Sequence, residues 1–334
     1  MIETVDYHTA GEPFRIVTSA IGEIPGATVL ERRESAVRGP ADEVRRLLCN
    51  EPRGHADMYG CFLVPPDDDD ADLGCLFWHK DGFSTACGHG TIALARYAVD
   101  EGLVDAPEDG EATVRIDVPS GRVVARVAIA GGEPVSVAFR NVPAYTLARS
   151  VGVETSRGAV EVDLAYGGAV YASARAADLE LSVSPRALPR LIELGREVKE
   201  TLAGHPATRH PRDDRLSGVY GVIWFDELED AAGSPLRQRN CTVFADGEVD
   251  RSPCGSGTSA RLALLAEDAR VDETRSLIHE SVLGTVFVGS VVERLEHDGH
   301  DAVVTEIEGN AHRTGTHAFT LDPSDPLGPG FQLR

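Results

Sequence analysis

Two short segments of the chain place a cysteine in the same glycine-rich setting. Residues 87–91 read Cys-Gly-His-Gly-Thr, and residues 254–258 read Cys-Gly-Ser-Gly-Thr. The two cysteines lie 167 residues apart, half of the 334-residue chain, and an alanine- and leucine-rich pattern with helical spacing follows each motif. The first turn of a helix offers unpaired N–H groups and a partial positive charge. We therefore expect both thiols to have a lowered pKa.

Two such helix starts facing one another across a domain interface could hold a carboxylate and act on the carbon beside it. Glycines after the cysteine let an anion approach the backbone closely. The N–H groups expected to bind the carboxylate are those of Gly88, His89, Gly255 and Ser256. One sulfur, as thiolate, would remove the α-proton, and the other, as thiol, would deliver a proton to the opposite face. This two-base chemistry inverts the stereocentre.

Two further side chains could bind the amine of an α-amino acid. Asp250 precedes Cys254 by four residues, and His89 follows Cys87 by two. Taken alone, each residue has a simpler structural interpretation: the aspartate as a turn residue in Asp-Arg-Ser-Pro, the histidine as a packing or capping group. The repetition of the whole pattern in both halves of the chain favours the functional interpretation.

The elements around the motifs also repeat. An apolar strand and a polar turn precede each motif, and a helix follows it, which predicts a duplicated domain. Elsewhere the chain consists mainly of short alternating stretches separated by Ser-Gly, Gly-Gly and Asp-Gly turns, with one longer helix near residues 184–203. The pattern predicts an α+β fold of two similar strand-rich lobes, each around a central helix. Residues 1–150, with 312–334, would form the lobe that carries Cys87, and residues 151–311 the lobe that carries Cys254.

Composition excludes several classes of partner. The net charge of −22 disfavours nucleic acids and anionic membranes. No stretch approaches the roughly 20 apolar residues that span a bilayer. The start, MIETVDYHTAGEPF, carries acids where a secretory signal would carry bases. We therefore expect a cytoplasmic enzyme that acts on a small molecule.

The remaining cysteines suggest neither disulfides nor a metal site. Cys49, Cys61, Cys75 and Cys241 lie in apolar, strand-like contexts, and no two of the six cysteines are spaced as Cys-x-x-Cys. We interpret these four as small core residues.

Over nearly its whole length the sequence resembles the proline racemase family, which includes hydroxyproline 2-epimerases and trans-3-hydroxy-L-proline dehydratases. The paired Cys-Gly-His-Gly and Asp-Arg-Ser-Pro-Cys-Gly-x-Gly-Thr segments are specific to it when they occur together. The segments that carry the resemblance are DYHTAGEPFRIV (6–17), HADMYG (55–60), DGFSTACGHGTIALARYAVDEGLV (81–104), AYGGAVYA (165–172), FADGEVDRSPCGSGTSARLAL (244–264) and GNAHRTGTHAFTLDPSDPL (309–327).

The resemblance implies a fold like that of diaminopimelate epimerase and an isomerase without metal, pyridoxal phosphate or nucleotide, often a homodimer. Cys87 and Cys254 match the family's two catalytic cysteines. His89 and Asp250 match the residues that contact the substrate nitrogen. By resemblance alone, further residues near the site would be His8, Thr9, Gly11, Tyr166 and Gly167.

The resemblance leaves two reactions open. The flanking sequence is most similar to the dehydratase branch, a lyase branch in which threonine typically replaces the second cysteine and the 3-hydroxyl is eliminated to give a cyclic imine. This chain has Cys254 there, and Ala86 where the family often has methionine. Because returning a proton requires an acid at that position, we expect racemisation or epimerisation of proline or 4-hydroxyproline, with dehydration of trans-3-hydroxy-L-proline as the alternative.

Three other classes fit less well. Gly-His-Gly-Thr-Ile-Ala matches a dinucleotide-binding fingerprint, but the chain lacks the alternation of strand and helix that this fold requires. A cysteine hydrolase would pair Cys87 with His89, yet residues two apart at a helix start should point in different directions, and Cys254 would have no role. An amino-acid-binding protein without catalysis would need neither thiol.

Overall fold

The computed structural model describes residues 1–229 and 234–333, which form two compact units. The first comprises Met1–Val137 and Asn310–Arg334, and the second Ala138–Gly309. The boundary expected at residue 150 falls inside strand β9 (Ala144–Thr155), which pairs with strands of the second unit. Residues 230–233 and 334, which the expected lobes include, lie outside the described residues.

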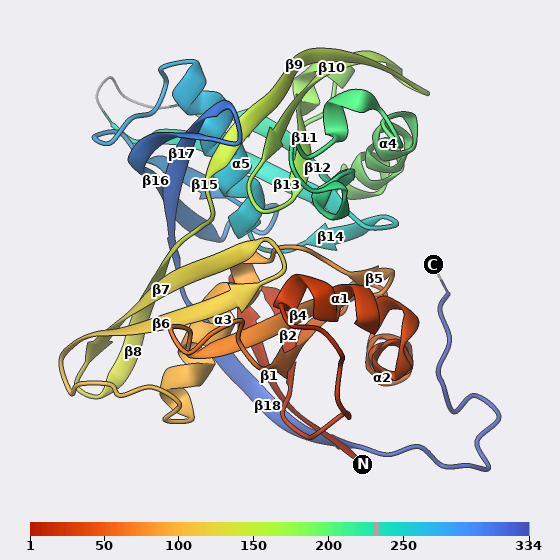
Figure 1. Ribbon diagram of the computed structural model, residues 1–334. Coiled ribbons are helices and arrows are strands. Elements are labelled where there is room, and N and C mark those ends of the chain that lie inside the picture. The colour runs from red at the N-terminus through yellow and green to blue at the C-terminus, as the bar shows by residue number, and fades with distance from the viewer. Residues whose placement is uncertain (230–233, 334) are drawn as a thin grey trace. The chain divides into compact units, whose positions relative to one another are not determined.

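The first unit is a sheet in which hairpins alternate with parallel pairings (Figure 1). Strand β1 lies antiparallel between β18 and β2, β2 runs parallel to β3, β3 antiparallel to β4, β4 parallel to β6, and β6 antiparallel to β7. Its strands are β1 (Ile2–Thr9), β2 (Glu12–Val17), β3 (Tyr59–Val64), β4 (Leu73–His79), β5 (Gly82–Phe83), β6 (Gly110–Val118), β7 (Gly121–Ala130) and β18 (Ala311–Phe319), and β8 (Glu133–Arg140) continues into the second unit.

The strands of the second unit close into a ring. From β9 the pairing runs through β10, β11, β12, β13, β15, β16 and β17 and returns to β9. These strands are β10 (Gly158–Tyr166), β11 (Val170–Arg175), β12 (Val219–Glu227), β13 (Leu236–Phe244), β14 (Glu248–Asp250), β15 (Leu277–Glu280), β16 (Val286–His297) and β17 (His300–Gly309).

Both units follow one pairing order. In each, an antiparallel pair is followed by a parallel pairing, an antiparallel pairing, a second parallel pairing and a closing hairpin. In each, a short strand, β5 or β14, folds back on its predecessor just before the cysteine motif. This correspondence supports the duplication expected from the two motifs.

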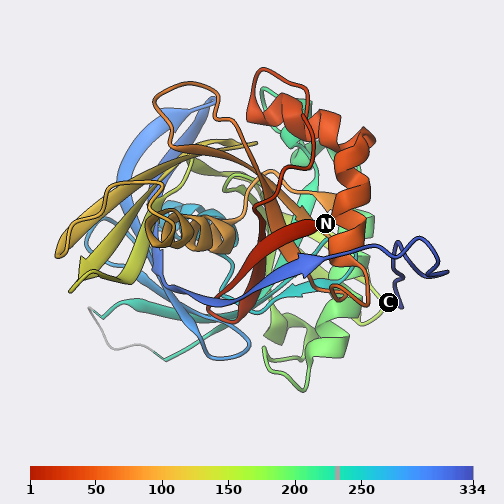
Figure 2. The ribbon, with the colours of Figure 1, turned by 90° about the horizontal axis from the view of Figure 1, so that it is seen from below.

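A buried helix runs through each sheet. Helix α3 (Gly88–Asp100) contacts β1, β2, β6, β7 and β18, and helix α5 (Gly255–Glu267) contacts β9, β10, β11, β16 and β17. Figure 2 shows α3 among the strands of its own unit. Every residue of α5 from Gly255 to Ala266 is buried, so this part of the helix presents no face to water, as expected of a helix enclosed on all sides. The prediction of two strand-rich lobes, each around a central helix, is therefore confirmed.

Further helices cover the outer faces of the sheets. Helix α4 (Leu188–Thr201) fulfils the expectation of a helix near residues 184–203. Helices α1 (Val29–Arg38) and α2 (Pro40–Cys49) were not expected from the sequence. Cys49 is buried as predicted, but it ends α2 and does not lie in a strand. The short 3₁₀ helices are η1 (Ala176–Leu179), η2 (Pro206–Thr208) and η3 (Asp214–Leu216).

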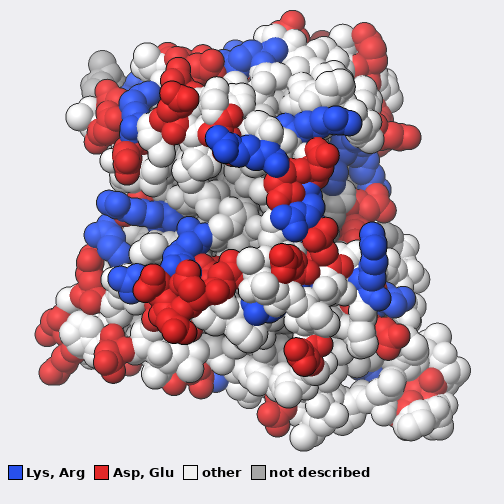
Figure 3. All heavy atoms as spheres, in the orientation of Figure 1, with Lys and Arg blue, Asp and Glu red and all other residues white. Residues whose placement is uncertain are grey.

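The surface carries charges of both signs. On the face drawn in Figure 3, acidic and basic side chains alternate over short distances despite the net charge of −22. Within the described part of the chain, no helix combines the length and the apolar character needed to cross a membrane.

Candidate active site

Cys87 forms the N-cap of α3. Its backbone is extended (φ −155°), and its Sγ accepts a hydrogen bond from the N–H of Gly90 at 3.2 Å. The Thr91 hydroxyl donates to the Cys87 carbonyl at 2.9 Å. A Cβ on Gly90 would lie 2.8 Å from the sulfur, so glycine at this position leaves the space that the thiol fills.

Cys254 occupies the same place at the start of α5. The Thr258 hydroxyl donates to its carbonyl at 2.7 Å, and a Cβ on Gly257 would lie 2.9 Å from its sulfur. The repeated Cys-Gly-x-Gly-Thr motif therefore has the same local explanation in both units. The second glycine makes room for sulfur, and the threonine holds the carbonyl of the cysteine.

The two cysteines differ in backbone conformation. Cys254 has φ +64°, a region that costs about 1–2 kcal/mol for a residue with a Cβ and that surrounding contacts must enforce. Three buried polar side chains hold this segment. Asn240 Nδ2 donates to the Pro253 carbonyl at 3.0 Å and to His279 Nε2 at 2.9 Å, while His279 Nδ1 lies 2.8 Å from the Thr258 hydroxyl oxygen.

The protonation of His279 follows from these partners. Burial lowers its pKa from 6.5 to about 3, so the ring is neutral near pH 7. Because Nε2 accepts from Asn240, Nδ1 carries the proton and donates to Thr258, whose hydroxyl donates onward to the Cys254 carbonyl. We call Asn240, His279 and Thr258 the Cys254 clamp.

His89 is buried against aromatic rings and the Cys87 sulfur. Its ring lies edge-on to Phe14 and Tyr59, with centroids 5.8 and 4.8 Å away. Both ring nitrogens lie 3.4 Å from Cys87 Sγ, so the argument that this pair points in different directions was wrong. A sulfur equidistant from both nitrogens lies over the ring and not along a lone pair. This is poor geometry for the general base of a cysteine hydrolase.

Asp250 shapes the turn that leads into Cys254. Its Oδ1 accepts from the Ser252 N–H at 2.8 Å and from the Ser252 hydroxyl at 2.6 Å. Ser252 Oγ in turn accepts from the Cys254 N–H at 3.1 Å. The aspartate is 3% exposed. It therefore makes the turn that the sequence suggested, and its negative charge also lies close enough to affect the Cys254 thiol.

The expectation of a lowered pKa is wrong for Cys254. Burial is the largest cause and the Asp250 carboxylate the second, and together they raise the pKa of this thiol well above its ordinary value. The Tyr171 hydroxyl and the Gly257 N–H act in the opposite direction and offset only part of the rise. Cys254 is thus a thiol near neutral pH, and in that state it can donate a proton.

The residues singled out by resemblance alone divide into two groups. Thr9 and Gly167 lie at the starts of the central helices: the Thr9 hydroxyl donates to the His89 carbonyl at 2.9 Å, and a Cβ on Gly167 would lie 2.6 Å from the Ser256 carbonyl oxygen. The others make contacts elsewhere. His8 accepts from the Gly11 N–H and lies against His312, and Tyr166 packs on Tyr145 and His210.

The sequence reasoning missed several residues around Cys254. Two of them, Tyr171 and Ser252, are buried and contact Cys254 directly. Two others, Asn240 and His279, are buried members of the Cys254 clamp. The available signal was the AYGGAVYA segment, whose tyrosine at 171 points toward the cysteine motif, and the serine of Asp-Arg-Ser-Pro. Asn240 and His279 gave no local signal, because strand pairing alone brings them together.

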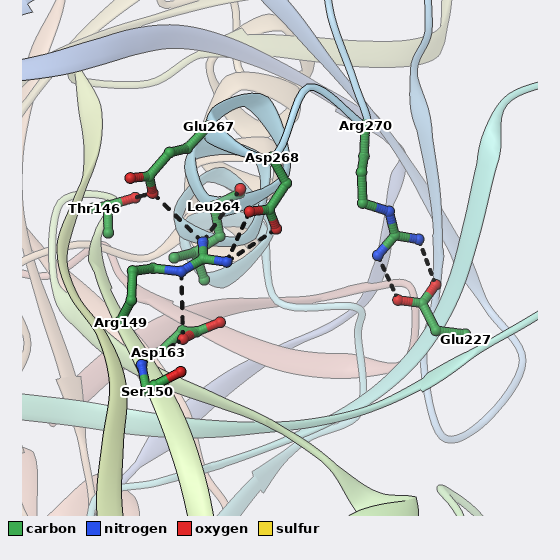
Figure 4. Close-up of polar contacts among 9 residues, drawn as sticks. All are labelled: Thr146, Arg149, Ser150, Asp163, Glu227, Leu264, Glu267, Asp268 and Arg270. Carbon is green, nitrogen blue, oxygen red and sulfur yellow. Dashed lines mark hydrogen bonds and ion pairs between the residues drawn. The ribbon is translucent and has the colours of Figure 1, made fainter.

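Ion pairs anchor the other end of α5 (Figure 4). Arg149 on β9 reaches the Leu264 carbonyl, Glu267 and Asp268, and it also pairs with Asp163 on β10. Arg270, just past the helix, forms a bidentate pair with Glu227 of β12 at 2.7 and 3.0 Å. These contacts fix the helix that carries Cys254 against three strands of its unit.

Comparison with known proteins places this chain in a family. Residues 4–332 match the proline racemase family. A 3-hydroxyproline 2-epimerase from Burkholderia multivorans is 43% identical over 100% of this chain and 98% of its own length. A trans-3-hydroxy-L-proline dehydratase from Bacillus thuringiensis subsp. konkukian is 40% identical over 99% of this chain and 97% of its own.

Solved structures of similar proteins support the same assignment. A hydroxyproline epimerase from Agrobacterium vitis, solved with bound trans-4-hydroxy-L-proline, has a TM-score of 0.92 at 31% identity, covering 99% of this chain and 95% of that one. A PhzF-family protein from Bacillus anthracis, with a TM-score of 0.58 at 12% identity over 95% of this chain and 98% of that one, shares the fold alone. The match over nearly the full length shows that the chain belongs to the proline racemase family.

Proposed function

We propose that the chain inverts the α-carbon of a hydroxyproline by proton transfer between Cys87 and Cys254. Cys87, whose sulfur accepts a hydrogen bond from the first turn of α3, acts as the base in one direction. Cys254, which is protonated near neutral pH, acts as the acid. Both roles reverse in the other direction.

The single observation that carries the proposal is the thiol at residue 254. Inversion needs an acid on the face opposite to the base, and a buried thiol with a raised pKa is an acid at neutral pH. The first-turn N–H groups of α3 and α5 would bind the carboxylate, and His89 and Asp250 would bind the ring nitrogen. A homodimer and a cytoplasmic location stay predictions.

The sequence led us to expect inversion of proline or 4-hydroxyproline, with 3-hydroxyproline only as a substrate for dehydration, whereas the relatives favour 3-hydroxyproline for inversion too. The Burkholderia multivorans 3-hydroxyproline 2-epimerase is 43% identical, whereas the Agrobacterium vitis epimerase solved with a 4-hydroxyproline is 31% identical. We therefore place 3-hydroxyproline first, ahead of 4-hydroxyproline and proline.

Dehydration is the second candidate. Several relatives of 39–43% identity are named trans-3-hydroxy-L-proline dehydratases. Both reactions begin with removal of the α-proton and differ in the fate of the carbanion. Epimerisation returns a proton to the α-carbon, whereas dehydration expels the 3-hydroxyl with formation of a C2–C3 double bond.

The experiment is incubation in D₂O under reducing conditions with L-proline, trans-4-hydroxy-L-proline and trans-3-hydroxy-L-proline separately. Proton NMR follows loss of the α-proton signal, and chiral chromatography identifies the products. We expect deuterium at the α-carbon together with the opposite configuration, fastest for a hydroxyproline. A cyclic imine as sole product would favour the dehydratase, and no exchange with any of the three would overturn both candidates.

Cysteine variants test the roles. We expect Cys87→Ser and Cys254→Ser to lose inversion by several orders of magnitude, because an alcohol is a far weaker acid and base at neutral pH. Cys241→Ala is the matched control, since this thiol is buried in the same unit as Cys254 with a pKa raised to about 12. Full activity in Cys254→Ser would contradict the two-thiol mechanism.

A further inference from the structure

Tyr171 lies beside the Cys254 sulfur. The tyrosine belongs to β11 and is fully buried. Its hydroxyl oxygen accepts a hydrogen bond from the Cys254 thiol at 3.7 Å and lies 2.7 Å from the Ser256 hydroxyl oxygen. Ser256 follows Cys254 by two residues, in the first turn of α5. The three side chains form a continuous chain of hydrogen bonds.

The surroundings fix the position of the Tyr171 ring. Tyr220 packs edge-on against it, with centroids 5.8 Å apart and planes at 84°. On the neighbouring strand, its register partner Gly221 approaches so closely that a Cβ there would lie 3.2 Å from Tyr171 Cε1. Ile223, Ala260 and Leu264 belong to the same buried apolar cluster. The hydroxyl is therefore held in place and cannot easily turn away from the sulfur.

A tyrosine hydroxyl suits a sulfur that changes its protonation state. It can accept a hydrogen bond from a thiol and donate one to a thiolate. The Gly90 N–H at Cys87 can only donate. A purely structural thiol needs no hydroxyl partner of this kind, because buried cysteines pack as small apolar groups. The arrangement thus points to a function connected with proton transfer at Cys254.

We propose that Tyr171 is a positioning residue that holds the Cys254 thiol for proton return and so sets how the carbanion divides between epimerisation and dehydration. This inference rests on the proposed function. In epimerisation the S–H bond breaks and a C–H bond forms at the α-carbon, which leaves a thiolate. In dehydration the carbanion pair forms a C2–C3 double bond, the C3–O bond breaks, and the hydroxyl leaves as water with the proton that Cys87 had taken. The resulting enamine then gains a proton at C3 and loses its N–H proton, which gives the cyclic imine.

The test is the division of products from trans-3-hydroxy-L-proline in D₂O. Among molecules that have lost their α-proton, one measures the fractions that are inverted, exchanged with retention, and converted to the cyclic imine. We expect Tyr171→Phe to lower the ratio of inverted product to the other two by about tenfold, the size expected for one lost hydrogen bond to a reacting group. Ser256→Ala should shift the ratio in the same direction.

Tyr220→Phe is the matched control, because it removes a hydroxyl from the ring packed against Tyr171. We expect its product ratio to equal that of the unaltered protein. A ratio has the advantage that partial unfolding lowers all products alike and leaves it unchanged. An unchanged ratio in Tyr171→Phe would overturn the proposal, whatever the result for Ser256→Ala.

A second measurement separates this proposal from the proposed function. In a Cys87→Ser background, alkylation of Cys254 by iodoacetamide is followed against pH by mass analysis of its peptide. The Tyr171 hydroxyl lowers the pKa of Cys254, so Tyr171→Phe should move the alkylation profile to higher pH. If the protein with both cysteines exchanges no hydroxyproline but the profile shifts, the proposed function is overturned and the contact between Tyr171 and the Cys254 thiol stands. An unshifted profile would overturn the role of Tyr171.

Discussion

At the scale of single residues, both sulfurs occupy space that only glycine leaves open. Gly90 and Gly257 each lie so close to a cysteine that an added Cβ would come within 2.9 Å of the sulfur. The cysteines themselves differ, because Cys254 is held at φ +64° by the Asn240–His279–Thr258 clamp while Cys87 is extended. The repeated motif thus builds two thiol sites with different supports.

The close approach at Gly257 gives a first prediction. Gly257→Ala should displace the Cys254 sulfur and lower kcat for α-proton exchange by about 100-fold, the effect of a displacement near 1 Å at a reacting group. The helix itself should not weaken, because alanine favours helices more than glycine does. The comparison is Gly152→Ala on β9, where an added Cβ meets nothing within 4 Å. Equal kcat values for the two variants would contradict the prediction.

The clamp histidine predicts a pH dependence of stability. The pKa of His279 is lowered in the folded protein from 6.5 to about 3, so the unfolded chain binds a proton over this range that the folded one does not. The free energy of unfolding is therefore unaffected by His279 above pH 6.5. Between pH 6.5 and about 3 it falls by about 1.4 kcal/mol for each pH unit, because only the unfolded chain binds this proton.

Urea unfolding at pH 7.5, 6.5, 5.5 and 4.5 measures this effect. His279→Gln should lose stability less steeply with falling pH than the unaltered protein. His210, whose pKa is also lowered by burial, remains in both proteins and cancels in the comparison. Parallel pH profiles for the two proteins would show that His279 is not the group responsible.

At the scale of elements, α5 is fixed along its whole length. The clamp holds its start, Arg149 and Arg270 anchor its end, and Arg261 ties its middle to β13. Arg261 Nε donates to Gln238 Oε1 at 3.0 Å, and the guanidinium carbon Cζ of Arg261 lies 3.9 Å from the centroid of the Phe225 ring. Burial lowers its pKa to about 10, so it stays charged near pH 7.

This arrangement predicts different costs for two arginine substitutions. Arg261→Met should lower the free energy of unfolding by about 1–3 kcal/mol, because it leaves the buried Gln238 carbonyl oxygen without its donor. Arg149→Met, which removes ion pairs near the surface, should cost about 1 kcal/mol or less. Denaturant unfolding of both variants provides the comparison, and the reverse order would contradict the role assigned to Arg261.

At the scale of the whole molecule, the charge of −22 dominates the electrostatics. Arginines offset acids locally, as in the pairs of Arg122 with Asp68 and Asp117, but the excess of acidic groups remains. Self-repulsion of this kind destabilises a compact state, and salt screens it over roughly 10 Å at 0.1 M. A small anionic substrate therefore needs a local positive potential, which the first turns of α3 and α5 can supply.

The charge predicts that salt stabilises the protein. Raising NaCl from 0.05 to 0.5 M should increase Tm, with each kcal/mol of added stability shifting Tm by about 1–2 °C for a chain of this length. An equal osmolarity of sucrose is the control for effects that do not depend on charge. A Tm that stays constant or falls with NaCl would mean that local ion pairs outweigh the net repulsion.

The sequence by itself determined the repeat, the class of fold and the helices after the two cysteines. These features arise from local periodicity, glycine placement and the spacing of the motifs, all of which act over a few residues. Helices α1 and α2 could also have been found, since Thr28 and Glu31 both cap the start of α1 and Pro40 opens α2. The family resemblance, which depends on similarity of residues, pointed to the same two cysteine motifs.

Only the tertiary structure decided the protonation state of the Cys254 thiol. A helix start alone suggests a lowered pKa, but enclosure by a ring of strands removes water and buries the neighbouring Asp250 carboxylate as well, so the pKa of Cys254 rises. The partners Tyr171, Asn240 and His279 come from three different strands, and their approach to Cys254 depends on strand pairing between segments far apart in the chain. Contacts of this kind leave no local pattern in the sequence.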